Sequence, residues 1–118
     1  MVPVPLHWRR HLARGYNQAE RIGRPLAGRL ELPFTSALAR LRATPPQSRL
    51  DQAARLRNLR QAFVVRRPDS VAGRHVVLVD DVATTGATLD AAAATLKAAG
   101  AAVVTAVVAG RTPVSSWD

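Results

Sequence analysis

The chain has no cysteine, few aromatic residues and a single lysine. Without cysteine, disulfide bonds and thiolate metal sites are excluded. Aromatic residues make up 4% of the sequence, which tells against a surface dedicated to stacking nucleic-acid bases. No apolar run approaches the ~20 residues of a membrane-spanning helix, and the N-terminus lacks the pattern of a signal peptide. We therefore expect a cytoplasmic protein with no membrane insertion.

Arginine is the residue type in excess. The chain carries 17 basic and 8 acidic residues, a net charge of +9. Residues 1–74 hold fifteen arginines against four acids, a net +11, whereas residues 75–118 have a net charge of −2. A positive field favours phosphate-rich partners, either nucleic acid or a small polyphosphate. The composition typical of a GC-rich genome explains the total equally well, but it does not explain the asymmetry.

The 118 residues are enough for a single domain, residues 1–118. Hydrophobic patterning predicts strands over 2–5, 38–43, 62–66, 75–80 and 102–109, and helices over 18–31 and 86–99. Asn17 and Glu20 have the spacing of a helix capping box. Two strand–helix–strand runs, 2–43 and 75–109, each indicate a βαβ unit, so we expect an α/β fold with a mostly parallel central sheet of about five strands. Two helices are few for two sheet faces. Either a neighbouring chain covers the remainder, or an N-terminal part of the domain is missing.

The most informative segment is Val76-Val-Leu-Val-Asp80-Asp81-Val-Ala-Thr84-Thr85-Gly86-Ala87-Thr88. A buried strand ends in two adjacent carboxylates, and a loop of small hydroxyl residues then turns into a helix. The helix N-terminus attracts an anion, and glycine allows the backbone to approach it closely. Carboxylates accept hydrogen bonds from a sugar diol. A phosphorylated sugar would satisfy both groups. The alternative is that the acids are turn and cap residues of an ordinary α/β unit.

This pattern of an apolar strand, two acids and Thr-Thr-Gly-x-Thr resembles the motif of type I phosphoribosyltransferases that binds phosphoribosyl pyrophosphate (PRPP). The resemblance implies that Asp80 and Asp81 are the catalytic residues and hold the ribose hydroxyls, and that residues 84–88 hold the 5′-phosphate. The implied PRPP-binding set is Asp80, Asp81, Val82, Ala83, Thr84, Thr85, Gly86, Ala87 and Thr88. Mg²⁺ is the implied cofactor, bound mainly through ligand oxygens, with Asp80 and Asp81 as candidate carboxylates.

The same resemblance assigns Arg14, Gly15, Arg40 and Arg42 to the pyrophosphate, and residues 43–60 to a flexible lid loop that keeps water from the reaction. Each assignment has a structural alternative. Arg14 and Gly15 would serve equally as loop or capping residues, and Arg40 and Arg42 as a solvated strand edge. Residues 43–60 would also serve as an ordinary polar connection.

Further matches narrow the family. The runs Val2-Pro3-Val4-Pro5-Leu6, Arg14-Gly15-Tyr16-Asn17-Gln18-Ala19-Glu20 and Arg40-x-Arg42-x-Thr44 are similar to the ComF family of competence-associated proteins. The likeness runs from residue 2 to about 112. Members of that family usually carry an N-terminal zinc-binding, cysteine-rich segment, which this sequence lacks. The resemblance therefore implies a type I phosphoribosyltransferase-like fold that is abbreviated at its N-terminus.

Two functions stay open. The first is an enzyme that transfers the phosphoribosyl group of PRPP to a nitrogen acceptor and releases pyrophosphate. The alternative is a non-catalytic or regulatory PRPP-binding module in DNA uptake, which contacts single-stranded DNA or the competence machinery. The positive charge alone implies weak, electrostatic binding of single-stranded DNA. A second copy of the chain, forming a homodimer, is a further candidate partner.

Overall fold

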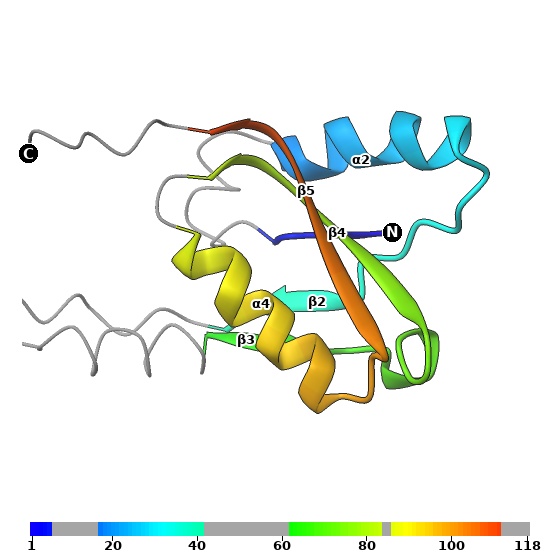
Figure 1. Ribbon diagram of the computed structural model, residues 1–118, viewed down its shortest axis with the longest axis vertical. Helices are drawn as coiled ribbons and strands as arrows, with labels where there is room; N and C mark the ends of the chain where they lie inside the picture. The colour runs from blue at the N-terminus through cyan, green and yellow to red at the C-terminus, as the bar shows by residue number, and fades with distance from the viewer. Residues whose placement is uncertain (6–16, 42–61, 84–85, 112–118) are drawn as a thin grey trace, which may run out of the picture.

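Strands and helices alternate along the chain, as expected for an α/β protein (Figure 1). The structure is a computed structural model that describes residues 1–5, 17–41, 62–83 and 86–111. The elements in chain order are β1 (Val2–Pro3), α2 (Gln18–Arg29), β2 (Leu38–Arg40), β3 (Phe63–Val65), the 3-10 turn η1 (Pro68–Ser70), β4 (His75–Ala83), α4 (Ala87–Ala98) and β5 (Val103–Arg111).

The main sheet has three parallel strands in the order β1-β4-β5. β4 lies in the centre, and this position explains its continuous apolar run, because a central parallel strand is covered on both faces. β5 pairs with β4 in a register that runs from His75 opposite Val103 to Ala83 opposite Arg111. The predicted βαβ unit over 75–109 is therefore confirmed. It brings the carboxyl ends of β4 and β5 to the same edge of the sheet.

The predicted single sheet of about five strands is wrong. Five strands are present among the described residues, but β2 and β3 pair with each other in a separate antiparallel ribbon. The strand–helix–strand run over 2–43 is consequently no βαβ unit of the main sheet. Pro3 and Pro5 have no N–H to donate, and the Val4 N–H donates to the Val79 carbonyl at 2.8 Å. Few donors of β1 are left for a second neighbour, so β2 finds its partner in β3.

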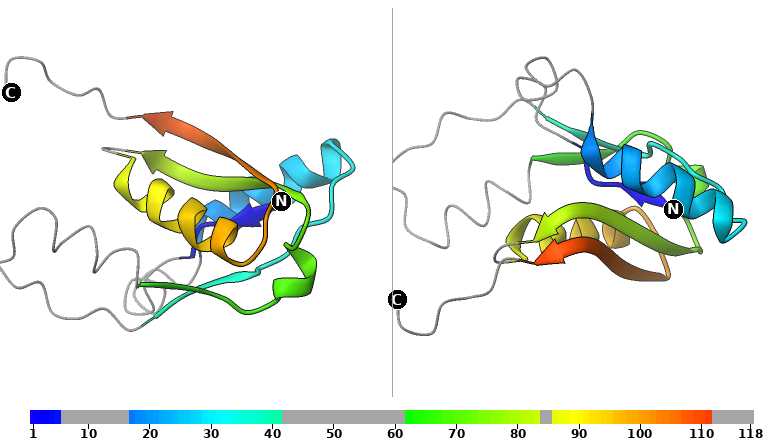
Figure 2. Two further views of the ribbon diagram at one scale, coloured as in Figure 1. Left: turned by 60° about the horizontal axis from the view of Figure 1, so that its bottom comes forward. Right: turned by 90° about the horizontal axis from the view of Figure 1, so that it is seen from above.

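Two helices, α2 and α4, pack against the main sheet. α4 contacts β4 and β5 on one side and β3 on the other, so it lies between the main sheet and the ribbon (Figure 2). α2 contacts β1 and β4. The main core joins buried residues of the sheet, α4 and the ribbon: Val2, Val4, Ala37, Leu38, Phe63, Val71, Val76, Leu78, Ala91, Ala92, Leu96 and Ala101. Each helix has 12 residues, and within the described part of the chain no helix is long and apolar enough to cross a membrane.

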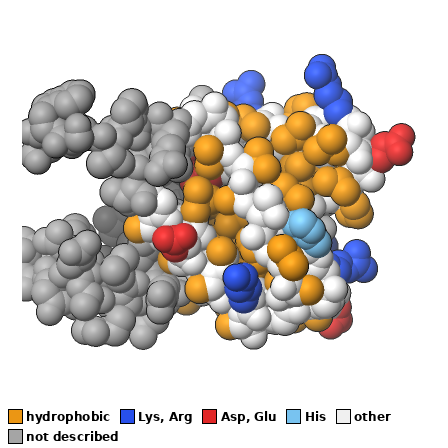
Figure 3. All heavy atoms as spheres, in the orientation of Figure 1, with side chains coloured by type: hydrophobic (Ala, Val, Ile, Leu, Met, Phe, Trp, Pro, Cys, Tyr) orange, Lys and Arg blue, Asp and Glu red, His pale blue; other side chains and the backbone are white. Residues whose placement is uncertain are grey.

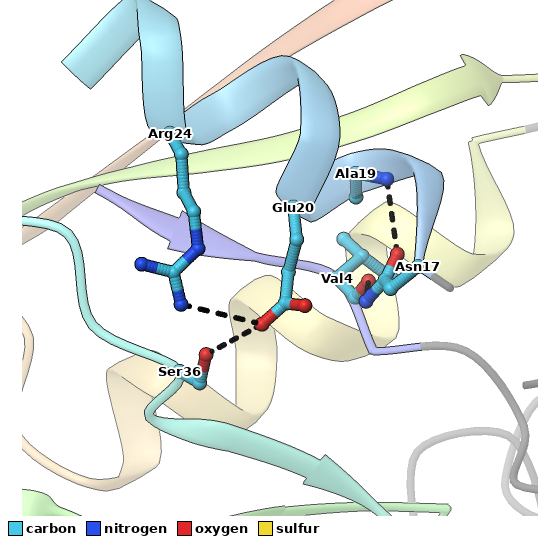
Figure 4. Close-up of polar contacts among 6 residues, drawn as sticks. All are labelled: Val4, Asn17, Ala19, Glu20, Arg24 and Ser36. Atoms are coloured by element: carbon cyan, nitrogen blue, oxygen red, sulfur yellow. Dashed lines mark hydrogen bonds and ion pairs between the residues drawn. The ribbon is translucent and has the colours of Figure 1, made fainter. Parts of the chain in front are cut away.

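The start of α2 is held by two polar residues that the sequence singled out (Figure 4). The buried Asn17 accepts a hydrogen bond from the Ala19 N–H at 2.9 Å and donates to the Val4 carbonyl at 3.2 Å. Its predicted role as the N-cap is confirmed. Glu20 accepts a hydrogen bond from the Ser36 hydroxyl at 2.9 Å and lies 4.0 Å from Arg24. The first turn of α2 is thereby tied to the end of β1 and to the segment before β2.

α2 ends two residues before the predicted boundary at residue 31. Leu30 is the C-cap, and Glu31 has a φ of 55°, a left-handed conformation that cannot continue a right-handed helix. The prediction placed the helix end too late because Leu30 fits the apolar spacing of the helix, whereas nothing in that spacing indicates the left-handed conformation of Glu31.

Candidate functional site

The two acids of the predicted motif lie within β4, near its carboxyl end. β4 continues to Ala83, three residues beyond the predicted end at Asp80, so both carboxylates are carried by the strand rather than by the loop after it. Asp80 accepts a hydrogen bond from the Asp81 N–H, and Asp81 accepts one from the Val82 N–H, both at 2.8 Å. Each carboxylate is thus oriented through one oxygen by the backbone of the following residue.

Asp80 is the electrostatically unusual member of the pair. Burial, followed by the hydrogen bond to the Asp81 side chain, raises the pKa of Asp80 to about 6. The Asp81 backbone N–H and the charge of Arg40 act in the opposite direction, and their effect is smaller. Two carboxylates held side by side with one of them half-buried are costly as anions. Carboxyl groups whose pKa is shifted by burial and by a neighbouring acid are typical of binding and catalytic sites.

Arg40, on the separate β2–β3 ribbon, acts on this pair through its charge. It is the last residue of β2 and lies opposite Phe63 of β3. Its guanidinium carbon lies 5.5 Å from the centroid of the Phe63 ring, within the range of a cation–π contact. The half-buried Arg40 also lowers the pKa of Asp80 by its charge. The structure therefore lets the charge of a residue predicted for pyrophosphate act on one of the two predicted ribose acids.

Gly86 supplies the turn from β4 into α4. It is the N-cap of α4 and has a φ of 82°, which a residue with a side chain rarely adopts. Its carbonyl accepts a hydrogen bond from the Asp90 N–H at 2.8 Å. Ala87 and Thr88 form the first turn of α4, where the positive end of the helix dipole lies. The predicted glycine turn and helix start are present just after the acidic pair.

The structure describes eight of the predicted site residues and not the others. Described are Arg40, Asp80, Asp81, Val82, Ala83, Gly86, Ala87 and Thr88. The predicted site residues Arg14, Gly15, Arg42, Thr84 and Thr85, and the predicted lid over 43–60, lie outside the described residues. The residues on either side of the undescribed stretch 42–61, Leu41 and Ala62, are described. Because Leu41 donates its N–H to the Ala62 carbonyl, the chain leaves β2 and re-enters β3 at adjacent points, next to Arg40.

The sequence predicts a strand over 62–66 that contains Phe63, but it does not predict the contact of Phe63 with Arg40. Phe63 is 5% exposed and belongs to the core. The contact with Arg40 depends on the register of β2 with β3. No local sequence signal carries that register. The exposed His75 hydrogen bonds to Thr105 at 2.7 Å near the amino end of β4, away from the acids.

The carboxylate oxygens of Asp80 and Asp81 could supply some, but not all, of the ligands of a metal ion. Among the described residues, no group of three or more histidine or acidic side chains could hold a metal ion. Asp80 and Asp81 each use one oxygen for a backbone N–H. A pair of carboxylates fits Mg²⁺ that a phosphorylated ligand and water mostly coordinate, and does not make an all-protein metal site.

Comparison with known proteins identifies one family model and several relatives that match this chain. Residues 17–115 match the family model described as the phosphoribosyl transferase domain. The chain is 46% identical over 105 residues to the DNA utilization protein YhgH of Escherichia coli, covering 88% of this chain and 45% of that protein. It is 38% identical over 92 residues to competence protein F of Haemophilus influenzae, covering 76% of this chain and 40% of that protein.

The similarity extends to a distant bacterium. Competence protein ComFC of Bacillus subtilis is 38% identical over 93 residues, covering 79% of this chain and 36% of that protein. The chain thus spans less than half the length of these curated relatives. No solved structure matches the chain significantly. The family match covers the acidic pair, Gly86 and α4 together. The chain therefore belongs to the phosphoribosyltransferase domain family and, within it, to the ComF group.

Proposed function

We propose that the chain binds PRPP with Mg²⁺ at the carboxyl end of β4 and transfers its phosphoribosyl group to a nitrogen acceptor. The observation that carries this proposal is the Asp80–Asp81 pair near the carboxyl end of the central parallel strand, together with the left-handed Gly86 that opens α4 five residues after Asp81. In a chain of the phosphoribosyltransferase domain family, this arrangement supports a site for a ribose diol beside a phosphate.

The acids would bind the 2′- and 3′-hydroxyls of the ribose. Backbone N–H groups already orient both carboxylates, so the pair is organised before the ligand arrives. Hydroxyl donors would also reduce the cost of keeping the half-buried Asp80 ionised, because a hydrogen bond to the charged form favours it. Residues 84–88, at the start of α4, would hold the 5′-phosphate.

The basic residues would bind the other end of the ligand. The charge of Arg40 lowers the pKa of Asp80, which supports a role for Arg40 at the pyrophosphate of a ligand that occupies the acidic pair. Arg14, Gly15 and Arg42 would complete this subsite, and residues 43–60 would exclude water. Bound Mg²⁺ would offset the charge that develops on the leaving pyrophosphate.

In the reaction, the bond between C1 of the ribose and the pyrophosphate oxygen breaks, and the bond between C1 and the acceptor nitrogen forms. The electron pair of the broken bond leaves with pyrophosphate, and the acceptor nitrogen loses a proton. The chain contributes mainly by positioning the two reactants and by stabilising charge.

The binding step is tested by calorimetry with PRPP and Mg²⁺. Asp80→Asn and Asp81→Asn are each expected to weaken binding about 10–150-fold, because each loses a charge-assisted hydrogen bond of about 1.5–3 kcal/mol. Asp69→Asn is the matched control, since it removes the same charge from the exposed turn η1 before the amino end of β4. Unchanged affinity in both Asp80→Asn and Asp81→Asn would contradict the ribose assignment.

The transfer step needs a separate assay. Release of pyrophosphate from PRPP in the presence of a panel of nucleobases and amines would support the enzyme.

A second candidate is the PRPP-binding module in DNA uptake, and the charge of +11 on residues 1–74 favours contact with nucleic acid. PRPP binding without pyrophosphate release for any acceptor would support this second function.

A further inference from the structure

A cavity of about 160 Å³ lies at the amino end of β4, away from the acidic pair. Its wall is formed by the first residues of β1 and β4, by the segment between α2 and β2, and by the segment just before β4. His75, which lines the cavity, and Asp80 are five residues apart on the same strand, a separation of about 16 Å at the usual rise of a β-strand. The cavity is therefore distinct from the site proposed for PRPP.

Hydrogen bonds to the backbone hold the wall of this cavity in place. On one side, the Met1 ammonium donates to the Pro33 carbonyl at 2.7 Å, and the Met1 carbonyl accepts from the Thr35 N–H at 3.0 Å. On the other side, the Arg74 carbonyl accepts from the Ala102 N–H at 2.9 Å. The cavity is thus formed before a ligand binds, as small-molecule sites usually are.

Apolar side chains form much of the wall, and the space between them suits a single ring. Val2, Leu32 and Val77 all line it. A cavity of about 150 Å³ with apolar walls admits benzene, whereas sites for drug-sized ligands begin at about 300 Å³. The space therefore fits the apolar body of a ligand with about six carbon atoms.

The polar part of the wall favours an anion. Among the described residues, no acidic side chain lines the cavity, whereas Arg74 does. Arg74 is exposed, and within the described part of the chain it forms no ion pair. His75 beside it is fixed by the hydrogen bond between its Nε2 and the Thr105 hydroxyl. In Figure 3 a histidine lies at the surface beside apolar side chains, and His75 is the only histidine among the described residues. The guanidinium of Arg74 is therefore available to a ligand at the border of an apolar space.

We propose that this cavity binds a small organic carboxylate. Its apolar body, a ring or a branched chain of about six carbon atoms, fills the space lined by Val2, Leu32 and Val77. Its carboxylate pairs with Arg74, because a guanidinium matches the planar carboxylate with two parallel hydrogen bonds. An inorganic anion would gain nothing from the apolar wall. The proposal does not depend on the proposed function, since the acidic pair takes no part in this site.

NMR titration of the labelled protein tests this site with benzoate as the probe and benzamide as its uncharged match. We expect benzoate to shift the amide signals around Thr35, Ser70 and Val77, and benzamide to bind more weakly. Arg74→Gln should weaken benzoate binding about three- to tenfold, as expected for the loss of a partly exposed ion pair, and should leave benzamide binding unchanged. Arg66→Gln is the matched control, because Arg66 is exposed and does not line the cavity.

Four results would overturn the proposal. They are benzoate binding that Arg74→Gln leaves unchanged, benzamide binding as tight as that of benzoate, shifts confined to residues outside the cavity, and no shift up to the solubility limit of benzoate. Inorganic phosphate that binds at the same residues as tightly as benzoate would also overturn it, because the apolar wall would then contribute nothing. Asp80→Asn should bind benzoate like the wild type, so a failure of the PRPP proposal leaves this test intact.

Discussion

At the scale of single residues, the site depends on the environment of Asp80. Its carboxylate is half-buried, interacts with Asp81 and feels the opposing charge of Arg40. Burial and Asp81 dominate, so the pKa lies at about 6, above the value of about 3.9 expected in the unfolded chain. The folded protein therefore carries a destabilising negative charge at neutral pH, which a ligand with hydroxyl donors would compensate.

This environment predicts a pH-dependent gain of stability for Asp80→Asn. Between about pH 4 and 6 the folded state binds more protons at Asp80 than the unfolded state, so the contribution of Asp80 to stability falls as the pH rises through this window. At pH 7.5 the variant should have a free energy of unfolding about 1 kcal/mol higher than the wild type, a value already reduced for solvent screening. The difference should disappear near pH 4.

Urea unfolding at several pH values measures this difference. Asp69→Asn in the exposed turn η1 serves as the control and should follow the wild-type profile. If Asp80→Asn is less stable than the wild type at pH 7.5, the ionised carboxylate stabilises the fold and the electrostatic account of the site is wrong.

At the scale of elements, the βαβ unit around the site depends on the turn between α4 and β5. Gly100 has a φ of 106° and accepts a hydrogen bond from the Gly73 N–H at 2.8 Å. The Ala101 N–H donates back to the Leu96 carbonyl at 3.1 Å. The chain thereby leaves the helix and returns to the sheet in the left-handed conformation that glycine adopts without strain.

Gly100→Ala is expected to destabilise the protein by about 1–2 kcal/mol, because a residue with Cβ resists the left-handed conformation. Its Cβ would also lie 3.4 Å from the Cβ of Ala72. Gly28→Ala is the matched control. Gly28 lies inside α2 with nothing within 4 Å of an added Cβ, so alanine should stabilise the protein by up to about 1 kcal/mol.

Thermal or urea unfolding compares the two glycine variants. Opposite signs of the change in free energy are expected. Equal effects of the two substitutions would show that the left-handed turn after α4 contributes nothing specific to stability.

At the scale of the whole molecule, charge is distributed unevenly between two parts of the chain. The segment with net charge +11 precedes β4, and the segment with net charge −2 contains β4, α4 and β5. Arg40 shows how the two parts meet, since it lies in the basic segment and acts on Asp80 in the acidic one. A positive field of this size favours phosphate-rich ligands.

This distribution predicts weak, salt-sensitive binding of single-stranded DNA that PRPP partly reverses. Each phosphate contact contributes a slope of about −0.7 to the log of affinity against the log of salt concentration. Titration of a fluorescent oligonucleotide at two salt concentrations, with and without PRPP, measures both effects. Binding that survives high salt and ignores PRPP would instead indicate a dedicated DNA site, and no binding at low salt would mean that the charge is only compositional.

The parts of the fold that the sequence alone determined are those with local signals. The apolar run before Asp80 specified a buried strand, and the β4–α4–β5 unit followed from the alternation of patterns over 75–109. Asn17 was predictable as a cap and Gly86 as a turn, because each effect arises from neighbouring backbone atoms. The acidic pair could be located near the carboxyl end of this strand for the same reason, and its assignment to a PRPP site stays a prediction.

The tertiary structure alone decided which distant segments meet. It separated β2 and β3 from the main sheet, because the prolines around β1 leave few backbone donors on that side. It buried the Asp80 carboxyl, which is the largest cause of its raised pKa, and it let the charge of Arg40 act on that carboxyl from a distant part of the chain. Among the described residues, it gave β5 a strand neighbour on one side only. Strand pairing and long-range electrostatics depend on contacts between residues far apart in the chain, and the spacing of residues within a short window carries no record of them.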